Sequence, residues 1–168
     1  SKPAKPVATA KDNGDVTGKP QDPAKADKIT VSYTGEDNQP KTAVGTKDPK
    51  GKWTVNTPEV QINPNTGEIT IPENKVKDGT EVTVVTKNGN GTDSDPAKAT
   101  AKFSKPAKPV ATAKDNGDVT AKPQNPAKAD KITVSYTGED NTPKTAVGTK
   151  GTNGKWTVNN PEVQINPN

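Results

Sequence analysis

The chain repeats itself. Residues 1–65 recur as residues 104–168 with seven differences, so 58 of the 65 positions are identical and the period is 103 residues. Solenoid units repeat every 20–50 residues or so, whereas one β-sandwich domain spans about 100. The repeat therefore predicts tandem domains, a first repeat over 1–103 and a second, truncated copy over 104–168.

The differences are unevenly distributed. Three of them are consecutive, DPK (48–50) against GTN (151–153), in a predicted hairpin loop where change is well tolerated. The full set of differing pairs is Gly18/Ala121, Asp22/Asn125, Gln39/Thr142, Asp48/Gly151, Pro49/Thr152, Lys50/Asn153 and Thr57/Asn160.

Apolar residues make up only 26% of the chain, but they are placed in a regular pattern. In KITVSYT, Ile29, Val31 and Tyr33 alternate with polar residues. The same alternation recurs in KWTV (52–55), EVQI (59–62), EITI (68–71) and EVTVV (81–85). Residues two apart share one face of a strand, so each segment has an apolar face and a polar face.

Turn-forming residues separate these segments, at 12–15, 34–38, 48–51, 63–67, 77–79 and 88–91. The low apolar content alone would favour disorder, but a disordered chain needs no such alternation, and the net charge of +4 is small. We therefore predict an all-β fold with a thin core, arranged as β-sandwich repeats.

The sequence contains neither Cys nor His. This composition removes disulfides, thiolate zinc sites, Cys nucleophiles and the usual general base. Its apolar runs are far shorter than the roughly 18 residues of a membrane-spanning helix. We expect a protein that is not an enzyme, needs no cofactor and does not insert into a membrane.

All 24 basic residues are Lys. Arg is the residue that recognises bases and phosphates with two hydrogen bonds, and no aromatic stacking platform accompanies the dispersed Lys residues. Nucleic acid is therefore not an expected partner. Attraction to anionic wall polymers or glycans is a weaker hypothesis that rests on the same Lys residues.

The second copy has no counterpart of residues 66–103, which carry three of the predicted strands. If one period is one sandwich, the second copy lacks a facing sheet, and we expect strand exchange and concentration-dependent dimers. The alternative is that 1–65 and 66–103 are separate small units. The residues expected to be left uncovered are Val134, Tyr136, Trp156, Val158, Val163 and Ile165.

The linker around 104–109 contains Pro106 and Pro109. Proline restricts its own φ and extends the preceding residue, so we expect a short, semi-rigid connection and an elongated rod of repeats. Phe103 directly precedes the linker. We interpret it as a core residue at the end of the last strand, with a plug between adjacent repeats as the alternative.

Three motifs of the repeat are distinctive: GKWTV (51–55), DGTEVTVVTKNGNG (78–91) and DPAKAT (95–100). Through them the whole period resembles the bacterial Ig-like repeats of Gram-positive cell-wall-anchored surface proteins, of the biofilm-associated and enterococcal-surface-protein type. The resemblance implies an Ig-like sandwich in an extracellular adhesin stalk that projects an adhesive region from the cell wall. The signal peptide, adhesive head and sorting motif of such a protein would lie outside this sequence.

Four carboxylates are weak calcium candidates: Asp12, Asp15, Asp93 and Asp95. Calcium takes six to eight oxygen ligands, and turns rich in Asp and Asn offer several. However, neither segment has the spacing of a dedicated calcium loop, and tight turns use the same residues. Turn formation is therefore the favoured interpretation.

Two other groups of residues have the composition of a known kind of site. Lys28, Asn56 and Glu59 have the residue types of an intramolecular Lys–Asn isopeptide bond, which requires a buried Lys and a buried Asn. Tyr33 and Trp53 resemble a carbohydrate-stacking pair, but both are in phase with the apolar faces of their strands, which predicts that they belong to the core.

The function expected from these observations is mechanical: a non-enzymatic spacer in a surface stalk that serves adhesion and biofilm formation. The alternative is a binding module that contacts host or wall ligands, or its own copies on neighbouring cells.

Overall fold

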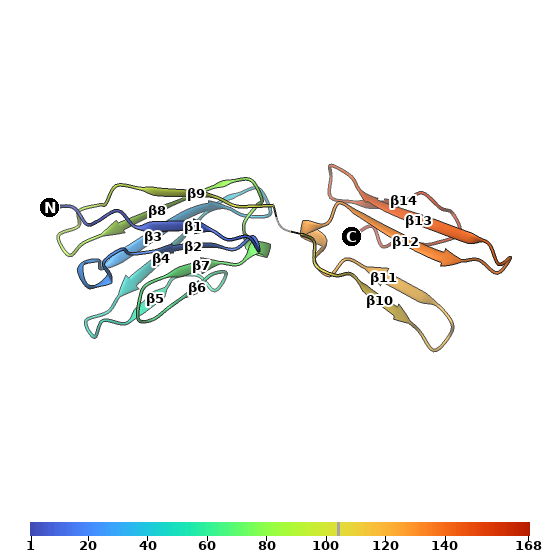
Figure 1. Ribbon diagram of the computed structural model, residues 1–168, viewed down its shortest axis with the longest axis horizontal. Coiled ribbons are helices and arrows are strands. Elements are labelled where there is room, and N and C mark those ends of the chain that lie inside the picture. Colours follow the sequence, from blue (N-terminus) through green and yellow to red (C-terminus); the bar gives the residue numbers. More distant parts are fainter. Residues whose placement is uncertain (104) are drawn as a thin grey trace. The chain divides into compact units, whose positions relative to one another are not determined.

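The computed structural model describes residues 1–103 and 105–168 and divides the chain into two compact units, Ser1–Lys105 and Pro106–Asn168. Both are built from antiparallel β-strands joined by turns, so the fold is all-β (Figure 1). Short 3-10 turns occur at Pro23–Lys25, Glu73–Lys75 and Pro126–Lys128. Within the described ranges, no helix has the length and apolar character needed to cross a membrane.

The first unit contains two sheets. One has the strand order β1 (Val7–Ala10), β2 (Val16–Lys19), β7 (Ile69–Ile71) and β6 (Gln61–Ile62). Within it, Val16 pairs with Ile71 and Gly18 with Ile69. The sheet therefore combines strands from both sides of residue 65.

The second sheet of this unit has the order β5 (Trp53–Val55), β4 (Pro40–Lys47), β3 (Lys28–Thr34), β8 (Glu81–Lys87) and β9 (Ala97–Thr100). The central strand β3 pairs with β4 on one side and with β8 on the other, so that Val31 pairs with Ala43 on one side and with Val84 on the other. Each sheet thus contains strands from both 1–65 and 66–103.

The core of the first unit lies between the two sheets. The alternation predicted for KITVSYT is confirmed, because Ile29, Val31 and Tyr33 are all buried. Burying a Val or Ile side chain contributes about 1.5–3 kcal/mol, so a core of few large residues suffices only when nearly all are fully buried. This arrangement is consistent with a β-sandwich. The other large apolar residues of the core are Val16, Trp53, Val60, Ile69, Ile71, Val76, Val82 and Val84.

Two strands carry small residues where large ones would collide. A Cβ atom at Gly18 in β2 would lie 2.7 Å from Cγ2 of Val84, and one at Gly45 in β4 would lie 2.8 Å from Cγ2 of Ile29. The β-branched side chains fill the space that these glycines leave. For this reason β2 and β4 lack the alternation of large apolar residues that marks β3, β7 and β8.

The loops follow the predicted turn chemistry. Asn38 adopts the left-handed region with φ 67° in the β3–β4 turn. In the β4–β5 turn, the Asp48 carboxylate accepts hydrogen bonds from the backbone N–H groups of Lys50 and Lys52, at 2.8 and 2.9 Å. Asp and Asn in these turns therefore satisfy backbone groups.

The interpretation of Phe103 as a core residue is wrong. Strand β9 ends at Thr100, and Ala101 takes the last buried position, where its carbonyl accepts a hydrogen bond from the N–H of Gly79. Phe103 is 80% exposed, and its ring lies next to Gly79. The chain leaves the sheet before this side chain could turn inward.

The second unit contains β10 (Val110–Ala113) paired with β11 (Val119–Lys122), and a sheet of order β12 (Lys131–Thr137), β13 (Pro143–Lys150) and β14 (Trp156–Val158). Its registers reproduce those of the first unit one period later: Lys131 pairs with Thr149 as Lys28 pairs with Thr46. In this copy Gln164 and Ile165 are not in a strand, because their counterparts Gln61 and Ile62 pair with β7.

Candidate functional site

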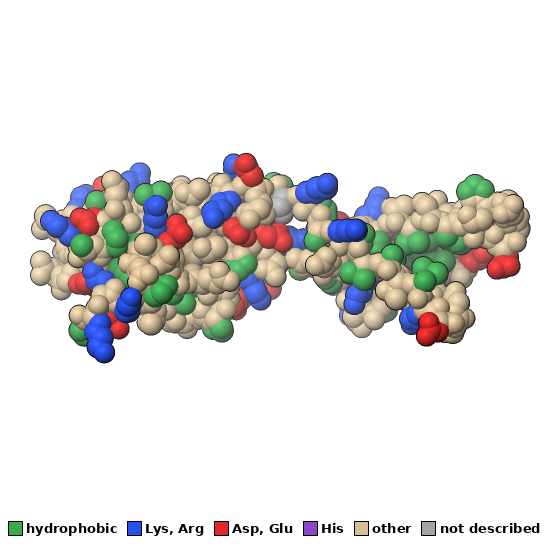
Figure 2. Space-filling view, turned by 60° about the horizontal axis from the view of Figure 1, so that its bottom comes forward, with side chains coloured by type: hydrophobic (Ala, Val, Ile, Leu, Met, Phe, Trp, Pro, Cys, Tyr) green, Lys and Arg blue, Asp and Glu red, His purple; other side chains and the backbone are tan. Residues whose placement is uncertain are grey.

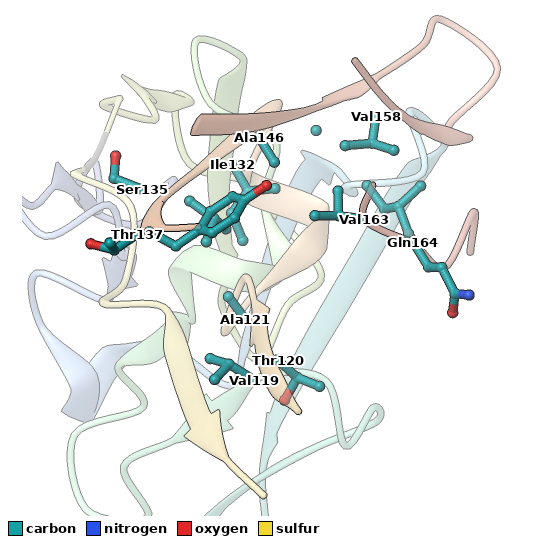
Figure 3. A pocket seen from close by; sticks show the side chains of 14 residues that line it. Val119, Thr120, Ala121, Ile132, Ser135, Thr137, Ala146, Val158, Val163 and Gln164 are labelled. Carbon is teal, nitrogen blue, oxygen red and sulfur yellow. The ribbon is translucent and has the colours of Figure 1, made fainter. Parts of the chain in front are cut away.

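The most prominent surface feature of the second unit is an apolar groove of about 380 Å³, here called the open groove. It lies between β11 and the inner face of β12–β14, and Figure 3 shows side chains of both sheets around it. Figure 2 shows hydrophobic side chains gathered in a hollow of this unit. The open groove is lined by Val119, Thr120, Ala121, Ile132, Val134, Ser135, Tyr136, Thr137, Ala146, Gly148, Val158, Val163, Gln164 and Ile165.

The groove consists of residues whose counterparts form the core of the first unit. Val16 is fully buried, whereas Val119, its counterpart, is 70% exposed. Ile132 and Val134 are only half-buried, although Ile29 and Val31 are buried. The difference arises because the first unit covers these positions with β7 and β8.

Side chains of strands β7 and β8 fill the corresponding space between the two sheets of the first unit. Ile69 and Ile71 lie in one sheet, Val82 and Val84 in the other, and all four are buried. Val84 packs closely enough on β2 to exclude a Cβ atom at Gly18. The described residues of the second unit hold no counterpart of these strands, so its two sheets are left with an open space between them.

Trp156 departs from the expectation that it is left uncovered. It is only 6% exposed, and its backbone N–H donates a 3.0 Å hydrogen bond to the carbonyl of Pro167. The Lys150 ammonium lies 5.8 Å from its ring centroid, as Lys47 lies 5.6 Å from that of Trp53. Contacts within 104–168 therefore bury this ring without the facing strands.

The other five residues expected to be uncovered, from Val134 to Ile165, do line the groove. Sequence reasoning missed Val119, Ala121, Ile132 and Ala146, which line it as well. The available signal was their alignment with Val16, Gly18, Ile29 and Ala43. The alignment identifies the groove residues only when it is also known that β2 packs against β8 across the core, and this packing is visible only in the tertiary structure.

The calcium candidates Asp12 and Asp15 lie in the β1–β2 turn. The Asp12 carboxylate forms a 2.8 Å ion pair with Lys102. Asp15 accepts hydrogen bonds from the backbone N–H of Glu73, at 2.8 Å, and from the Asn13 side chain, at 3.2 Å. Both carboxylates therefore take part in contacts that hold the turn and link it to the rest of the unit.

The other pair, Asp93 and Asp95, lies between β8 and β9. Asp93 forms a 2.8 Å ion pair with Lys87, and Asp95 forms one of the same length with Lys2. Over residues 1–103 and 105–168 the structure brings together no group of three acidic side chains that could hold a metal ion. The four candidates are thus not assembled into one site, and the calcium hypothesis stays a prediction to be tested.

Two of these ion pairs join β1 to β9. Lys2 and Asp95 precede the two strands, and Asp12 and Lys102 follow them, while β1 and β9 lie side by side. Hydrogen bonding to Lys102 lowers the pKa of Asp12, and hydrogen bonding to Lys2 lowers the pKa of Asp95. The pairs therefore fasten both ends of a contact between the two sheets.

The isopeptide hypothesis is wrong for Lys28 and Asn56. Both residues are exposed, and the Asn56 side chain accepts a 2.9 Å hydrogen bond from the N–H of Val44. Glu59 forms an ion pair with Lys41 instead. The prediction that Tyr33 and Trp53 are core residues is confirmed, because both are buried.

No model of a known protein family matches this chain.

Proposed function

We propose that this protein is a non-enzymatic structural repeat of a bacterial surface adhesin stalk, which acts as a semi-rigid spacer in adhesion and biofilm formation. In this proposal Ig-like sandwich repeats follow one another as an elongated rod outside the cell wall. The repeat period of 103 residues and the family resemblance of GKWTV and DGTEVTVVTKNGNG support it.

The observation that carries the proposal is where the chain enters and leaves the first unit. The carbonyl of Ser1 accepts a 2.8 Å hydrogen bond from Asn88, just after the end of β8, whereas Phe103 lies beside Gly79, just before its start (Figure 1). Strand β8 has seven residues, so about 20 Å separates these ends. A unit entered at one end and left at the other adds its length to a chain of repeats.

The ion pairs between β1 and β9 fit the same role. A force applied to the two ends of the first unit acts through β1 and β9, since these strands are next to its entry and exit. The Lys2–Asp95 and Lys102–Asp12 pairs bridge the two strands at both ends. They resist the sliding of one strand along the other, which a load-bearing spacer requires.

The linker supports a rod. Pro106 and Pro109 restrict the short segment that follows the first unit. A flexible Gly/Ser linker would allow neighbouring repeats to fold back, whereas proline-rich segments act as semi-rigid spacers.

The test is a series of proteins that carry increasing numbers of complete 103-residue repeats. Small-angle scattering should show a maximum dimension that grows in proportion to the number of repeats. A matched series with Pro106 and Pro109, and their equivalents, replaced by Gly and Ser should grow less steeply. Compact profiles for the proline-containing series would contradict the proposal.

The same series separates the spacer from a binding module. Deleting repeats from a stalk should shorten the reach of the adhesive region gradually, while deletion from a binding array should lower avidity for its ligand. Micromolar binding of the purified array to a host or wall ligand would favour the binding module.

A further inference from the structure

We propose that the open groove is an acceptor site for a polypeptide segment with the sequence of residues 66–103, which joins the second unit by strand addition. The first unit shows how such a segment is held, since its strand β7 joins one sheet, β8 and β9 join the other, and their apolar side chains complete the core between the sheets. Residues 104–168 reproduce 58 of those 65 positions. The groove is therefore complementary to that segment at nearly every contact.

The backbone of β12 offers the pairing edge. In the first unit, β3 pairs with β4 along one edge. Along its other edge it pairs with β8, from Lys28↔Lys87 to Ser32↔Thr83. Its counterpart β12 pairs with β13, and within residues 105–168 no strand lies along its other edge. An unpaired edge presents N–H and C=O groups that pair readily with an incoming strand.

The same register fixes where the side chains go. In this register Thr83 of the added segment lies opposite Ser135, and its Val84 lies opposite Val134. The side chain of Val84 then points into the open groove, as Val84 of the first unit points into the core opposite Val31. The groove is apolar along this line, where Ala146 of β13 and Val158 of β14 line it as well. Burial of Val82 and Val84 would remove apolar area from water on both partners.

One of the seven differences between the copies makes the fit of this segment tighter than in the first unit. The position of Gly18 is Ala121 in the second unit, and a Cβ atom at Gly18 would lie 2.7 Å from Cγ2 and 3.1 Å from Cγ1 of Val84. Val is stiff at χ1 and cannot simply turn away. Ala121 therefore opposes Val at the position of Val84, and a smaller residue there relieves the conflict.

The first experiment tests occupancy and register by disulfide trapping, which is clean because the chain has no Cys. The complete chain carrying Ser135→Cys is mixed under mild oxidation with a synthetic peptide of residues 66–103 carrying Thr83→Cys. Residues directly opposite in an antiparallel pair have Cα atoms 4.5–5.5 Å or so apart, within disulfide range. We expect rapid, specific cross-linking.

The matched control is Ser32→Cys in the first unit, at the equivalent position. Ser32 already pairs with Thr83 of its own chain, so it should cross-link to the peptide at least tenfold more slowly. A second control peptide carries Thr83→Cys together with Val82→Asn and Val84→Asn, and should lose the reaction. Equal rates for Ser32→Cys and Ser135→Cys, or for the two peptides, would overturn the proposal.

The second experiment measures affinity by fluorescence anisotropy of labelled peptides. Ala121→Gly should tighten binding of the 66–103 peptide about tenfold, because it removes the overpacking against Val84. The same substitution should change binding of the Val84→Ala peptide less than threefold or so, since that conflict is already absent. Equal effects on both peptides, or no binding of either, would contradict the proposal.

Self-association is read in the same samples by analytical ultracentrifugation. A dimer that dissociates when the peptide is added supports the proposal, because the peptide and the second copy then compete for the open groove. A dimer that the peptide leaves intact while binding is absent counts against it.

Discussion

Gly18 and Val84 face each other across the core of the first unit so closely that a Cβ atom at Gly18 would lie 2.7 Å from Cγ2 of Val84. This contact joins the two sheets, since Gly18 lies in β2 and Val84 in β8. It also links the two parts of the period, residues 1–65 and 66–103.

The first prediction follows from that contact. Gly18→Ala should lower the free energy of unfolding of the first unit by about 1–3 kcal/mol, the usual cost of overpacking. Urea denaturation at neutral pH measures it. Adding Val84→Ala to Gly18→Ala should cost less than Val84→Ala costs alone. Strict additivity of the two effects would mean that the residues are not in repulsive contact.

The second prediction concerns Gly67 and Trp53. Gly67 has φ +76°, and a Cβ atom there would lie 2.8 Å from Cδ2 and Cε2 of the Trp53 ring. Gly51 is the matched control, because its φ is +86° but a Cβ atom there would have no neighbour within 4 Å. Each Ala substitution costs about 1–2 kcal/mol for the left-handed backbone. Gly67→Ala should cost at least about 1 kcal/mol more, through the ring contact.

Tryptophan fluorescence during urea denaturation measures the second pair of variants. The two substitutions share the backbone effect, so their difference isolates the contact with Trp53. Equal destabilisation by Gly67→Ala and Gly51→Ala would show that the ring moves aside without cost.

The third prediction is a pH dependence of stability. Lys102 and Lys2 lower the pKa values of Asp12 and Asp95 below the ordinary 3.8. A carboxylate with a lowered folded-state pKa stabilises the fold above its unfolded pKa, and this contribution is lost as the pH falls through the folded pKa. The urea midpoint of the unmodified chain should therefore fall on acidification below about pH 4.

The double variant Asp12→Asn with Asp95→Asn tests this prediction. Its midpoint should fall less between neutral pH and pH 3 or so than that of the unmodified chain. Both side chains are exposed, so high salt should reduce the difference by screening the ion pairs. Identical acid dependence of the two proteins at low salt would contradict the prediction.

The fourth prediction is that the second unit unfolds first. Its core positions are open, with Val119 70% exposed where Val16 is fully buried. Each unit contains one Trp, so Trp53→Phe leaves Trp156 as the reporter of the second unit, and Trp156→Phe leaves Trp53 as the reporter of the first. The Trp156 signal should change at the lower urea concentration.

An extended chain provides the control. Appending residues 66–103 after Asn168 should raise the midpoint reported by Trp156 and leave the midpoint reported by Trp53 unchanged. An unchanged Trp156 midpoint in the extended chain would show that residues 104–168 are already as stable as a complete repeat, which contradicts the prediction.

The fifth prediction concerns calcium. Asp12, Asp93 and Asp95 each form an ion pair with a Lys, and Asp15 accepts a backbone N–H. Calcium would have to displace these partners, so millimolar calcium should leave the thermal midpoint unchanged. A clear rise in calcium, absent in magnesium and lost in Asp93→Asn or Asp12→Asn, would establish the site.

The strands with large alternating residues were predictable from sequence because their signal is local. Ile29, Val31 and Tyr33 lie two apart, and a strand necessarily places them on one face. The turns were predictable for the same reason, since Asn38 and Gly51 supply backbone conformations that other residues adopt at a cost. Such features need no information about distant parts of the chain.

The remaining features depend on contacts between strands that are far apart in the sequence. The small residues of β2 and β4, such as Gly18 and Gly45, give no strand signal. They are small because side chains of other strands occupy the space that a Cβ atom would need. Phe103 looked like a core residue, but the position at which β9 leaves the sheet exposes it. The open groove likewise depends on which strands face which, because only the packing of β7 and β8 in the first unit shows which surfaces of residues 1–65 they cover.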